Sequence, residues 1–185
     1  MMEQQIILAG FGGQGILSLG KFMCFAGMKK DWNVSWLPSY GPEVRGGTAN
    51  CHVILSENEI ASPIISRATA VIAFNEPSLV KFEGEAAEGA AILVNSSLVE
   101  RKVSRTDVMA YYIPANRLAQ EAGSIKCLNV VMLGAYAALI SPELTEILQD
   151  VLKDAFAKKQ KVYEMNQKAF ALGEAYGRQL QQERG

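Results

Sequence analysis

A glycine-rich segment near the start of the chain carries the residue pattern that most directly suggests chemistry. Between an apolar run and an amphipathic run, residues 10–15 read GFGGQG, which matches G-x-G-x-x-G. Glycines tolerate positive φ and let another group approach the backbone. A helix that begins after such a turn offers free N–H groups and its positive dipole end to an anion. The segment predicts either an anion or cofactor site or a tight packing turn with nothing bound. Its candidate residues are Gly10, Gly12, Gly13, Gln14 and Gly15.

The two standard nucleotide-binding motifs each lack a required residue in this chain. A Rossmann dinucleotide site needs an acidic residue at the end of the second strand, about 20 residues further on, to hold the ribose hydroxyls. Here the second expected strand ends in Leu37-Pro38-Ser39-Tyr40, and Glu43 lies inside the following loop. A P-loop needs Gly-Lys-Ser/Thr, which does not follow these glycines. We therefore expect neither a standard NAD(P) site nor a P-loop.

A second loop, residues 39–48 (SYGPEVRGGT), is the sharper feature. One proline, three glycines and two charges in ten residues exclude a regular element. Loops at the carboxyl ends of neighbouring parallel strands meet at one edge of a sheet, so we expect this loop beside the glycine turn. Arg45 would then clamp a phosphate or carboxylate, or it pairs with Glu43 or with an acid of a partner chain. We favour the partner contact. The candidate residues are Tyr40, Glu43, Arg45, Gly46 and Gly47.

The cysteines and the histidine form no metal-binding or nucleophilic pattern. Cys24, Cys51 and Cys127 are far apart and form no C-x-x-C pair, which argues against a disulfide framework and against a zinc or iron–sulfur site held by this chain alone. The single histidine, His52, sits in the alternating run NCHVILS, where we expect a structural role. The carboxylates isolate no acid–base pair, so we expect no catalytic residue and no metal ligand in this chain.

Composition narrows the class of protein. A length of 185 residues suits one domain, which we expect to span residues 1–185. The 18 basic and 19 acidic side chains leave a net charge of −1, which argues against broad binding to nucleic acid or to a membrane surface. The apolar runs are broken well short of a membrane span, and MMEQQ lacks a basic leader region. We expect a cytoplasmic protein without a membrane span.

The elements that must position these residues alternate in the first half of the chain and become helical in the last third. Apolar periodicity and turn residues predict an α/β fold: a three-layer Rossmann-like domain with a mainly parallel sheet and a C-terminal helical layer. We also expect a hairpin-type turn at residues 56–59 with brief pairing after it, and Ser141 as a helix cap. The expected strands are 5–9, 33–37, 49–55, 70–74, 91–94 and 111–113, and the expected helices are 14–28, 78–82, 115–121, 128–140, 141–156 and 158–181.

Taken together, these segments resemble a known family. AGFGGQGI at 9–16, SYGPEVRGGTANCHVILS at 39–56 and AVIAFNEPSL at 70–79 are similar to the gamma subunit of the 2-oxoacid:ferredoxin oxidoreductases, the pyruvate/ketoisovalerate oxidoreductase gamma-domain family. The similarity extends to NVVMLGAYAAL at 129–139 and NQKAFALG at 166–173, so it covers nearly the whole chain. The pairing of the glycine turn with YGPEVRGG is what makes the match specific.

The resemblance implies a division of labour. Enzymes of this family oxidatively decarboxylate a 2-oxoacid to an acyl-CoA and pass the electrons to ferredoxin or a similar carrier. Their alpha and beta parts hold thiamine diphosphate with Mg, and iron–sulfur clusters lie in a ferredoxin-like delta subunit and in some beta subunits. The gamma part is an α/β layer fold that packs against alpha.

The resemblance therefore implies a subunit that binds no cofactor by itself and is inactive alone, with alpha, beta and delta subunits as partners. Its role would be structural, or it would line the CoA path. Analogy favours 2-oxoglutarate as the substrate of the complex. Two alternatives stay open: the related beta subunit of indolepyruvate oxidoreductase, and an independent dinucleotide-binding oxidoreductase domain.

Overall fold

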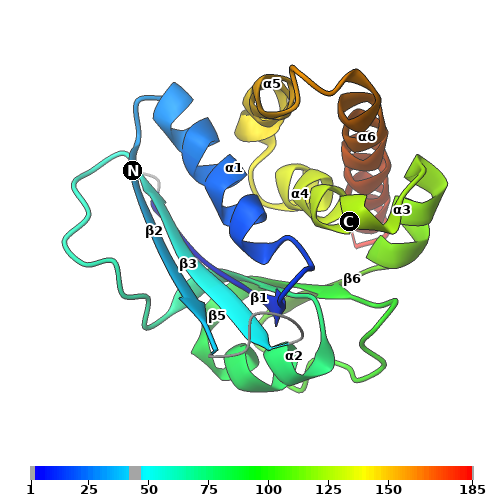
Figure 1. The fold of residues 1–185 in the computed structure, drawn as a ribbon. Helices are drawn as coiled ribbons and strands as arrows, with labels where there is room; N and C mark the ends of the chain where they lie inside the picture. Colours follow the sequence, from blue (N-terminus) through cyan, green and yellow to red (C-terminus); the bar gives the residue numbers. More distant parts are fainter. Residues whose placement is uncertain (1–2, 42–46, 185) are drawn as a thin grey trace.

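One sheet runs through the centre of the molecule (Figure 1). The computed structural model describes residues 3–41 and 47–184, and the strands of these ranges lie in the order β2-β3-β1-β4-β5-β6. Strands were expected in all six places, and each is found with its ends shifted by a few residues. Their bounds are β1 Glu3–Phe11, β2 Asn33–Tyr40, β3 Thr48–Ser56, β4 Ala68–Ala73, β5 Ala86–Asn95 and β6 Met109–Ile113.

The sheet is mainly parallel, as predicted, with β3 as the exception. β1 pairs in parallel with β4, β4 with β5, and β5 with β6. β3 runs antiparallel to both of its neighbours, β1 and β2. The chain between β2 and β3 is short, and a short connection can only return antiparallel because a parallel return needs a long crossover. The loop after β2 therefore lies beside the carboxyl end of β1, at the edge of the sheet where the parallel strands end.

The helices also match the predicted succession. The expected helix at residues 141–156 divides into a short 3₁₀ turn, η3, and the α-helix α5. The bounds are α1 Ile16–Lys29, α2 Glu76–Phe82, α3 Ala115–Ala122, α4 Leu128–Leu139, α5 Thr145–Ala155 and α6 Gln160–Gln182, with 3₁₀ turns η1 Glu83–Glu85, η2 Ile125–Cys127 and η3 Pro142–Leu144. None of the helices within the described ranges is long and apolar enough to cross a bilayer.

The two faces of the sheet are covered unequally (Figure 1). Helices α1 and α3 to α6 lie over one face, whereas α2 lies over the other. Alternate residues of β1 serve the two cores: Ile6 and Leu8 pack into the large helical core, and Ile7 and Ala9 pack into the smaller one. The molecule has three layers, one of them thin, and its C-terminal helices belong to the thick layer.

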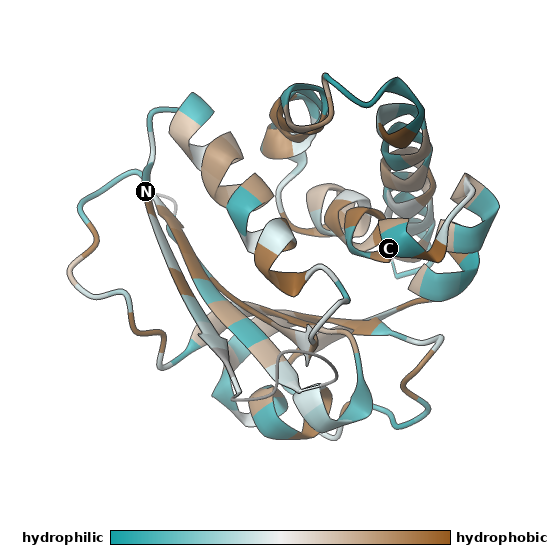
Figure 2. Ribbon diagram, in the orientation of Figure 1, coloured by the Kyte–Doolittle hydropathy of each residue, from teal (hydrophilic) through white to brown (hydrophobic). Residues whose placement is uncertain are grey.

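Helix α4 is buried along nearly its whole length, as its apolar sequence predicted. It packs along α6 in the helical layer. Figure 2 shows it mostly hydrophobic, whereas the turn between α5 and α6 is hydrophilic. Glycines let α4 and α6 approach to backbone contact. A Cβ on Gly173 would stand 1.9 Å from the carbonyl oxygen of Val131, and one on Gly134 would stand 2.1 Å from that of Phe170.

Three local predictions were wrong. Residues 60–61, directly after the turn at 56–59, do not pair as a strand. β2 continues through Pro38, which is tolerated because β2 is an edge strand and its outer side needs no N–H. Ser141 makes no capping hydrogen bond. It is fully buried instead, where its Oγ accepts from Gln4 Nε2 at 2.5 Å and donates to the Tyr136 hydroxyl at 3.0 Å.

Candidate functional site

The glycine turn between β1 and α1 is tightly packed at one end and open at its middle. A Cβ on Gly10 would lie 2.6 Å from Gln14 Oε1 and 2.9 Å from the Cβ of Phe74. Gly13 and Gly15 have φ angles of 92° and 77°, a backbone region that favours glycine. Beside Gly13, no atom of the described residues other than its chain neighbours lies within 4 Å of where a Cβ would stand. The turn therefore combines close packing with one face that another group can approach.

The side chain of Gln14 bridges the two sides of the turn. Its Oε1 accepts a hydrogen bond from the backbone N–H of Phe11 at 2.7 Å and another from Asn75 Nδ2 at 3.4 Å. Since Phe11 ends β1 and Asn75 follows β4, one side chain ties together the carboxyl ends of two neighbouring parallel strands. Gln14 therefore has a structural task in this turn.

The two predicted loops meet at this edge. The backbone N–H of Gly12 donates to the carbonyl of Gly47 at 2.9 Å, and Phe11 pairs with Thr48 at the start of β3. Tyr40 ends β2, where its backbone pairs with Ala49. These contacts confirm that the loops are neighbours. The other candidates of the second loop, Glu43, Arg45 and Gly46, lie outside the described residues.

A row of side-chain amides at the same edge was missed from the sequence. Asn75 is buried and caps α2, accepting from the N–H of Ser78 at 2.9 Å. Asn95, fully buried at the end of β5, donates through Nδ2 to Asn116 Oδ1 at 2.9 Å. The available signal was an asparagine at the end of each of two buried strands, in Phe74-Asn75 and in Val94-Asn95.

The cysteines are free and buried. Burial raises the pKa of the Cys24 and Cys51 thiols to about 12, and each donates a weak hydrogen bond to a backbone carbonyl at 3.7 Å. Thiols in this state are poor nucleophiles, because the thiolate is the reactive form. In the described part of the chain, no three His, Cys, Asp or Glu side chains gather in a group that could hold a metal ion.

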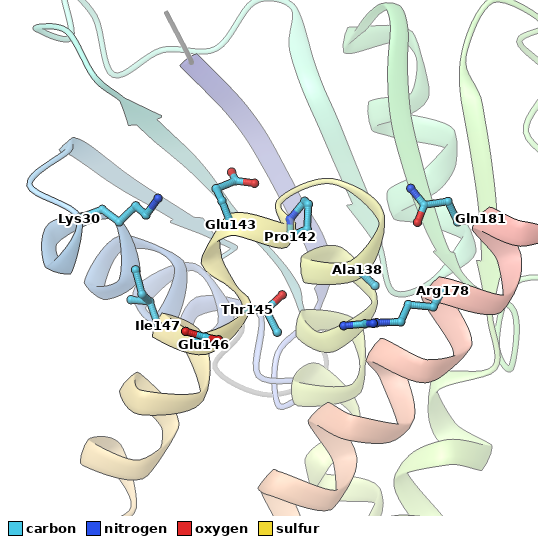
Figure 3. Close-up of a pocket in the computed structure, with 9 residues that line it drawn as sticks. All are labelled: Lys30, Ala138, Pro142, Glu143, Thr145, Glu146, Ile147, Arg178 and Gln181. Carbon is cyan, nitrogen blue, oxygen red and sulfur yellow. The ribbon is translucent and has the colours of Figure 1, made fainter.

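A pocket of about 680 Å³ lies near the amino end of β1, at the end of the strands opposite the glycine turn (Figure 3). Figure 3 shows its charged side chains entering from the end of α1, from α6, from η3 and from the start of α5. They are two cations and two carboxylates: Lys30, Arg178, Glu143 and Glu146. Arg178 is already paired with Glu174 of its own helix at 2.5 Å. Because the charges balance, we do not place the functional site here.

Comparison with known proteins matches nearly the whole chain to one family. Residues 5–176 match the family model described as pyruvate ferredoxin/flavodoxin oxidoreductase. The ketoisovalerate oxidoreductase subunit VorA of Methanothermobacter thermautotrophicus is 36% identical over 96% of this chain, which spans 37% of that protein. The 2-oxoglutarate synthase subunit KorC of Methanocaldococcus jannaschii is 31% identical over 97% of this chain and 96% of its own length.

Among solved structures, a chain of the 2-oxoglutarate:ferredoxin oxidoreductase from Magnetococcus marinus is similar throughout the domain. It superposes with a TM-score of 0.86 and 28% identity over 97% of this chain. This chain spans 32% of that one, whose structure holds 2-oxoglutarate, coenzyme A and succinyl-CoA. The chain thus spans about a third of two of these relatives and nearly all of the third.

Proposed function

The chain belongs to the pyruvate ferredoxin/flavodoxin oxidoreductase family, and from this premise we propose that it is the gamma subunit of a multi-subunit 2-oxoacid:ferredoxin oxidoreductase. The complex converts a 2-oxoacid and CoA to an acyl-CoA and CO₂ while it reduces ferredoxin. The observation that carries the proposal is the match to KorC, which covers both proteins almost end to end. In this proposal the chain acts together with alpha, beta and delta partners.

We place the catalytic cofactors on those partners. An iron–sulfur cluster takes four cysteine thiolates as a rule, whereas this chain has three cysteines. All three are buried, and they do not gather at one metal-binding site in the described residues. Thiamine diphosphate with Mg is assigned to the alpha and beta parts. Three free thiols also suit a reducing compartment, which supports a cytoplasmic location.

The task proposed for this chain lies at the carboxyl edge of its sheet. There the open side of Gly13 and the contact between Gly12 and Gly47 form a backbone-rich surface. Backbone N–H groups and the start of α1 suit either a phosphate of CoA or a carboxylate of the alpha subunit. We propose that this edge faces the alpha subunit and borders the path of CoA, with Arg45 as its cation.

The substrate is tested on the native complex. The complex is purified through a tag on this chain, and CoA-dependent viologen reduction is measured with 2-oxoglutarate, pyruvate, 2-oxoisovalerate and indolepyruvate. We expect the fastest reduction with 2-oxoglutarate. Fastest turnover of 2-oxoisovalerate would reassign the substrate to the branched-chain class. Turnover of indolepyruvate alone, or purification of the chain without partners, would overturn the proposal.

The role of the loop is tested with Arg45→Ala in the co-expressed complex. A raised KM for CoA with unchanged kcat assigns Arg45 to the CoA path, and loss of subunits from the purified complex assigns it to the interface. The matched control is Arg67→Ala, an exposed arginine that precedes β4 at the opposite end of the strands. Normal assembly and normal kinetics across CoA concentrations in the Arg45 variant would remove both roles.

A further inference from the structure

Two neighbouring hollows in the helical layer are lined largely by apolar side chains. The first, of about 480 Å³, lies between α1 and α5, where Phe25 and Met28 line it and are 49% and 55% exposed. The second, of about 450 Å³, lies beside the glycine turn. There Phe22 and Phe156 contact edge to face, with ring centres 6.1 Å apart. Ala155 lines both hollows, so they adjoin each other.

A cluster of lysines borders these hollows. The net charge of the whole chain is −1, yet residues 153–161 contain one acid and four lysines: Lys153, Lys158, Lys159 and Lys161. All four lysines are exposed. Three of them lie between Phe156 and Val162, which both line the second hollow. The turn between α5 and α6 that carries them stands away from the sheet (Figure 1). Positive charge is thus concentrated beside the apolar hollows.

The lysines of this cluster lack counter-charges. Within the part of the chain that the structure describes, none of the four forms an ion pair. The acids nearest to them in sequence have other partners. Asp154 pairs with Lys29 at 2.6 Å, and Glu164 accepts a hydrogen bond from Gln160 Nε2 at 2.9 Å.

The start of α6 adds to the excess of positive charge. Helix α6 begins at Gln160 with no acid in its first turn, and Lys159 and Lys161 flank that position. The N-terminus of a helix is the positive end of its dipole, so cations there lower the stability of the helix. Negative charge from another molecule would offset both the dipole and the repulsion between the lysines.

We propose that this face docks the acidic surface of a partner subunit. Apolar side chains of the partner fill the two hollows, and its carboxylates lie over the lysines. Apolar anchors seated in pockets supply most of the affinity at protein interfaces, while charges at the rim set orientation and association rate. A nucleic acid would neutralise the lysines but offers no apolar side chain for the hollows. Gly13 also lines the second hollow, so this face is continuous with the glycine edge.

The inference rests on the proposed function in taking the partner to be a subunit of the same complex. Carbodiimide cross-linking of the native complex tests it, because the reagent joins a lysine amine to a carboxylate that touches it. We expect Lys158, Lys159 or Lys161 to be joined to Asp or Glu residues of another subunit, as identified by mass spectrometry.

Acetylation of lysines gives an independent measurement on the same material. The three lysines should be acetylated more slowly in the complex than in the isolated chain. Lys81 is the reference, since it is exposed on α2 over the other face of the sheet, and its labelling should be the same in both.

A charge reversal separates docking from folding. Lys158→Glu, Lys159→Glu and Lys161→Glu combined should cause loss of the partner subunit when the complex is purified through a tag on this chain. The isolated variant should keep or raise its Tm, because acids suit the start of a helix. A residue that only supported the fold would lower both.

The apolar part of the face is tested separately. Phe25→Asp places a charge in the first hollow and should also cause loss of the partner, because a carboxylate there opposes burial of an apolar side chain. Val80→Asp is the matched control, since Val80 is 54% exposed and lies on α2. It should retain every subunit.

Equal acetylation of the three lysines in the isolated chain and in an active complex would overturn the proposal. Retention of every subunit by both the charge reversal and Phe25→Asp would do so too, as would cross-links to carboxylates of this chain alone. Each of these results leaves the proposed function standing, since that function is read from turnover of 2-oxoacids. Absence of turnover in a complex with protected lysines would contradict the proposed function and leave the docking face intact.

Discussion

At the scale of single residues, neutral side-chain amides, and not charged groups, link the carboxyl ends of the strands. Gln14 and Asn75 join the ends of β1 and β4, and Asn95 with Asn116 joins the end of β5 to α3. Such groups hold backbone in place at any pH, because they do not titrate. In the described part of this edge, the amides thus hold the backbone in a fixed position. Such a surface suits contact with a partner or with phosphate.

His52 is the residue whose protonation should affect stability near neutral pH. It is half-buried on β3 opposite Leu37 and Ile7, and its buried Nδ1 has no hydrogen-bond partner among residues 3–41 and 47–184. Burial lowers its pKa below the ordinary 6.5, Glu85 acts to raise it, and Lys81 acts to lower it further. The unfolded chain therefore binds a proton at a pH where the native protein does not.

We expect the free energy of unfolding to fall as the pH drops below 6.5, the ordinary histidine pKa, toward the lower native pKa of His52. Above 6.5 this contribution is fully present. Urea denaturation at about pH 7.5 and pH 5.5, on either side of the unperturbed histidine pKa, measures it. His52→Gln should flatten the dependence in that window. A slope unchanged in the variant would contradict the assignment. Asp107, whose pKa Arg105 lowers through a hydrogen bond, acts only below 3.8 and leaves the window undisturbed.

At the scale of elements, the packing of α4 against α6 holds the thick layer together. Sequence periodicity predicted both helices, but it could not show that they touch backbone to backbone. That contact follows from a glycine on each helix: Gly134 of α4 faces the backbone of Phe170, and Gly173 of α6 faces the backbone of Val131. A buried helix such as α4 gains its stability from this fit, since its sequence is apolar on every side.

Gly173→Ala should destabilise the protein by about 3 kcal/mol, the upper part of the range for overpacking, because the added methyl group meets a backbone carbonyl that cannot rotate away. Thermal and urea unfolding measure the change. Gly177→Ala, whose Cβ would stand 3.0 Å from that of Ala138, should cost less. Gly84→Ala is the control, since no described residue other than its chain neighbours has an atom within 4 Å of the added Cβ. It should change stability by less than about 0.5 kcal/mol. Equal stability of the three variants would contradict the packing account.

At the scale of the whole molecule, the sheet is covered unequally. The central strands and the thick helical layer are tightly packed, whereas the thin side has less regular structure. The central strands β1 and β4 are buried between the two cores, and residues such as Ile7 and Val71 have no exposed surface. On the thin side, residues 57–67 form no helix or strand, and Ile64 is 69% exposed there. The described thin side is therefore held by fewer regular backbone hydrogen bonds than the central strands.

Hydrogen exchange read by mass spectrometry should follow this division. In the isolated chain, amides of β1 and β4 should exchange slowest and those of residues 57–67 fastest, because their backbone lacks ladder hydrogen bonds. The same measurement in the proposed complex should slow exchange at every subunit interface. Slow exchange of residues 57–67 in the isolated chain would contradict the expectation.

The sequence by itself determined the alternation of elements, the mainly parallel α/β class, the burial of α4 and the family. Each of these rests on local periodicity, on turn residues or on motifs that are short in the chain. The tertiary structure alone decided that β3 runs antiparallel between β1 and β2, because strand pairing depends on contacts between distant residues. It also decided that Ser141 joins Gln4 and Tyr136 instead of capping a helix. The hollow beside the glycine turn that Asn129 and Asn166 line required the fold as well, since its walls come from segments that meet only when α1, α4 and α6 pack together.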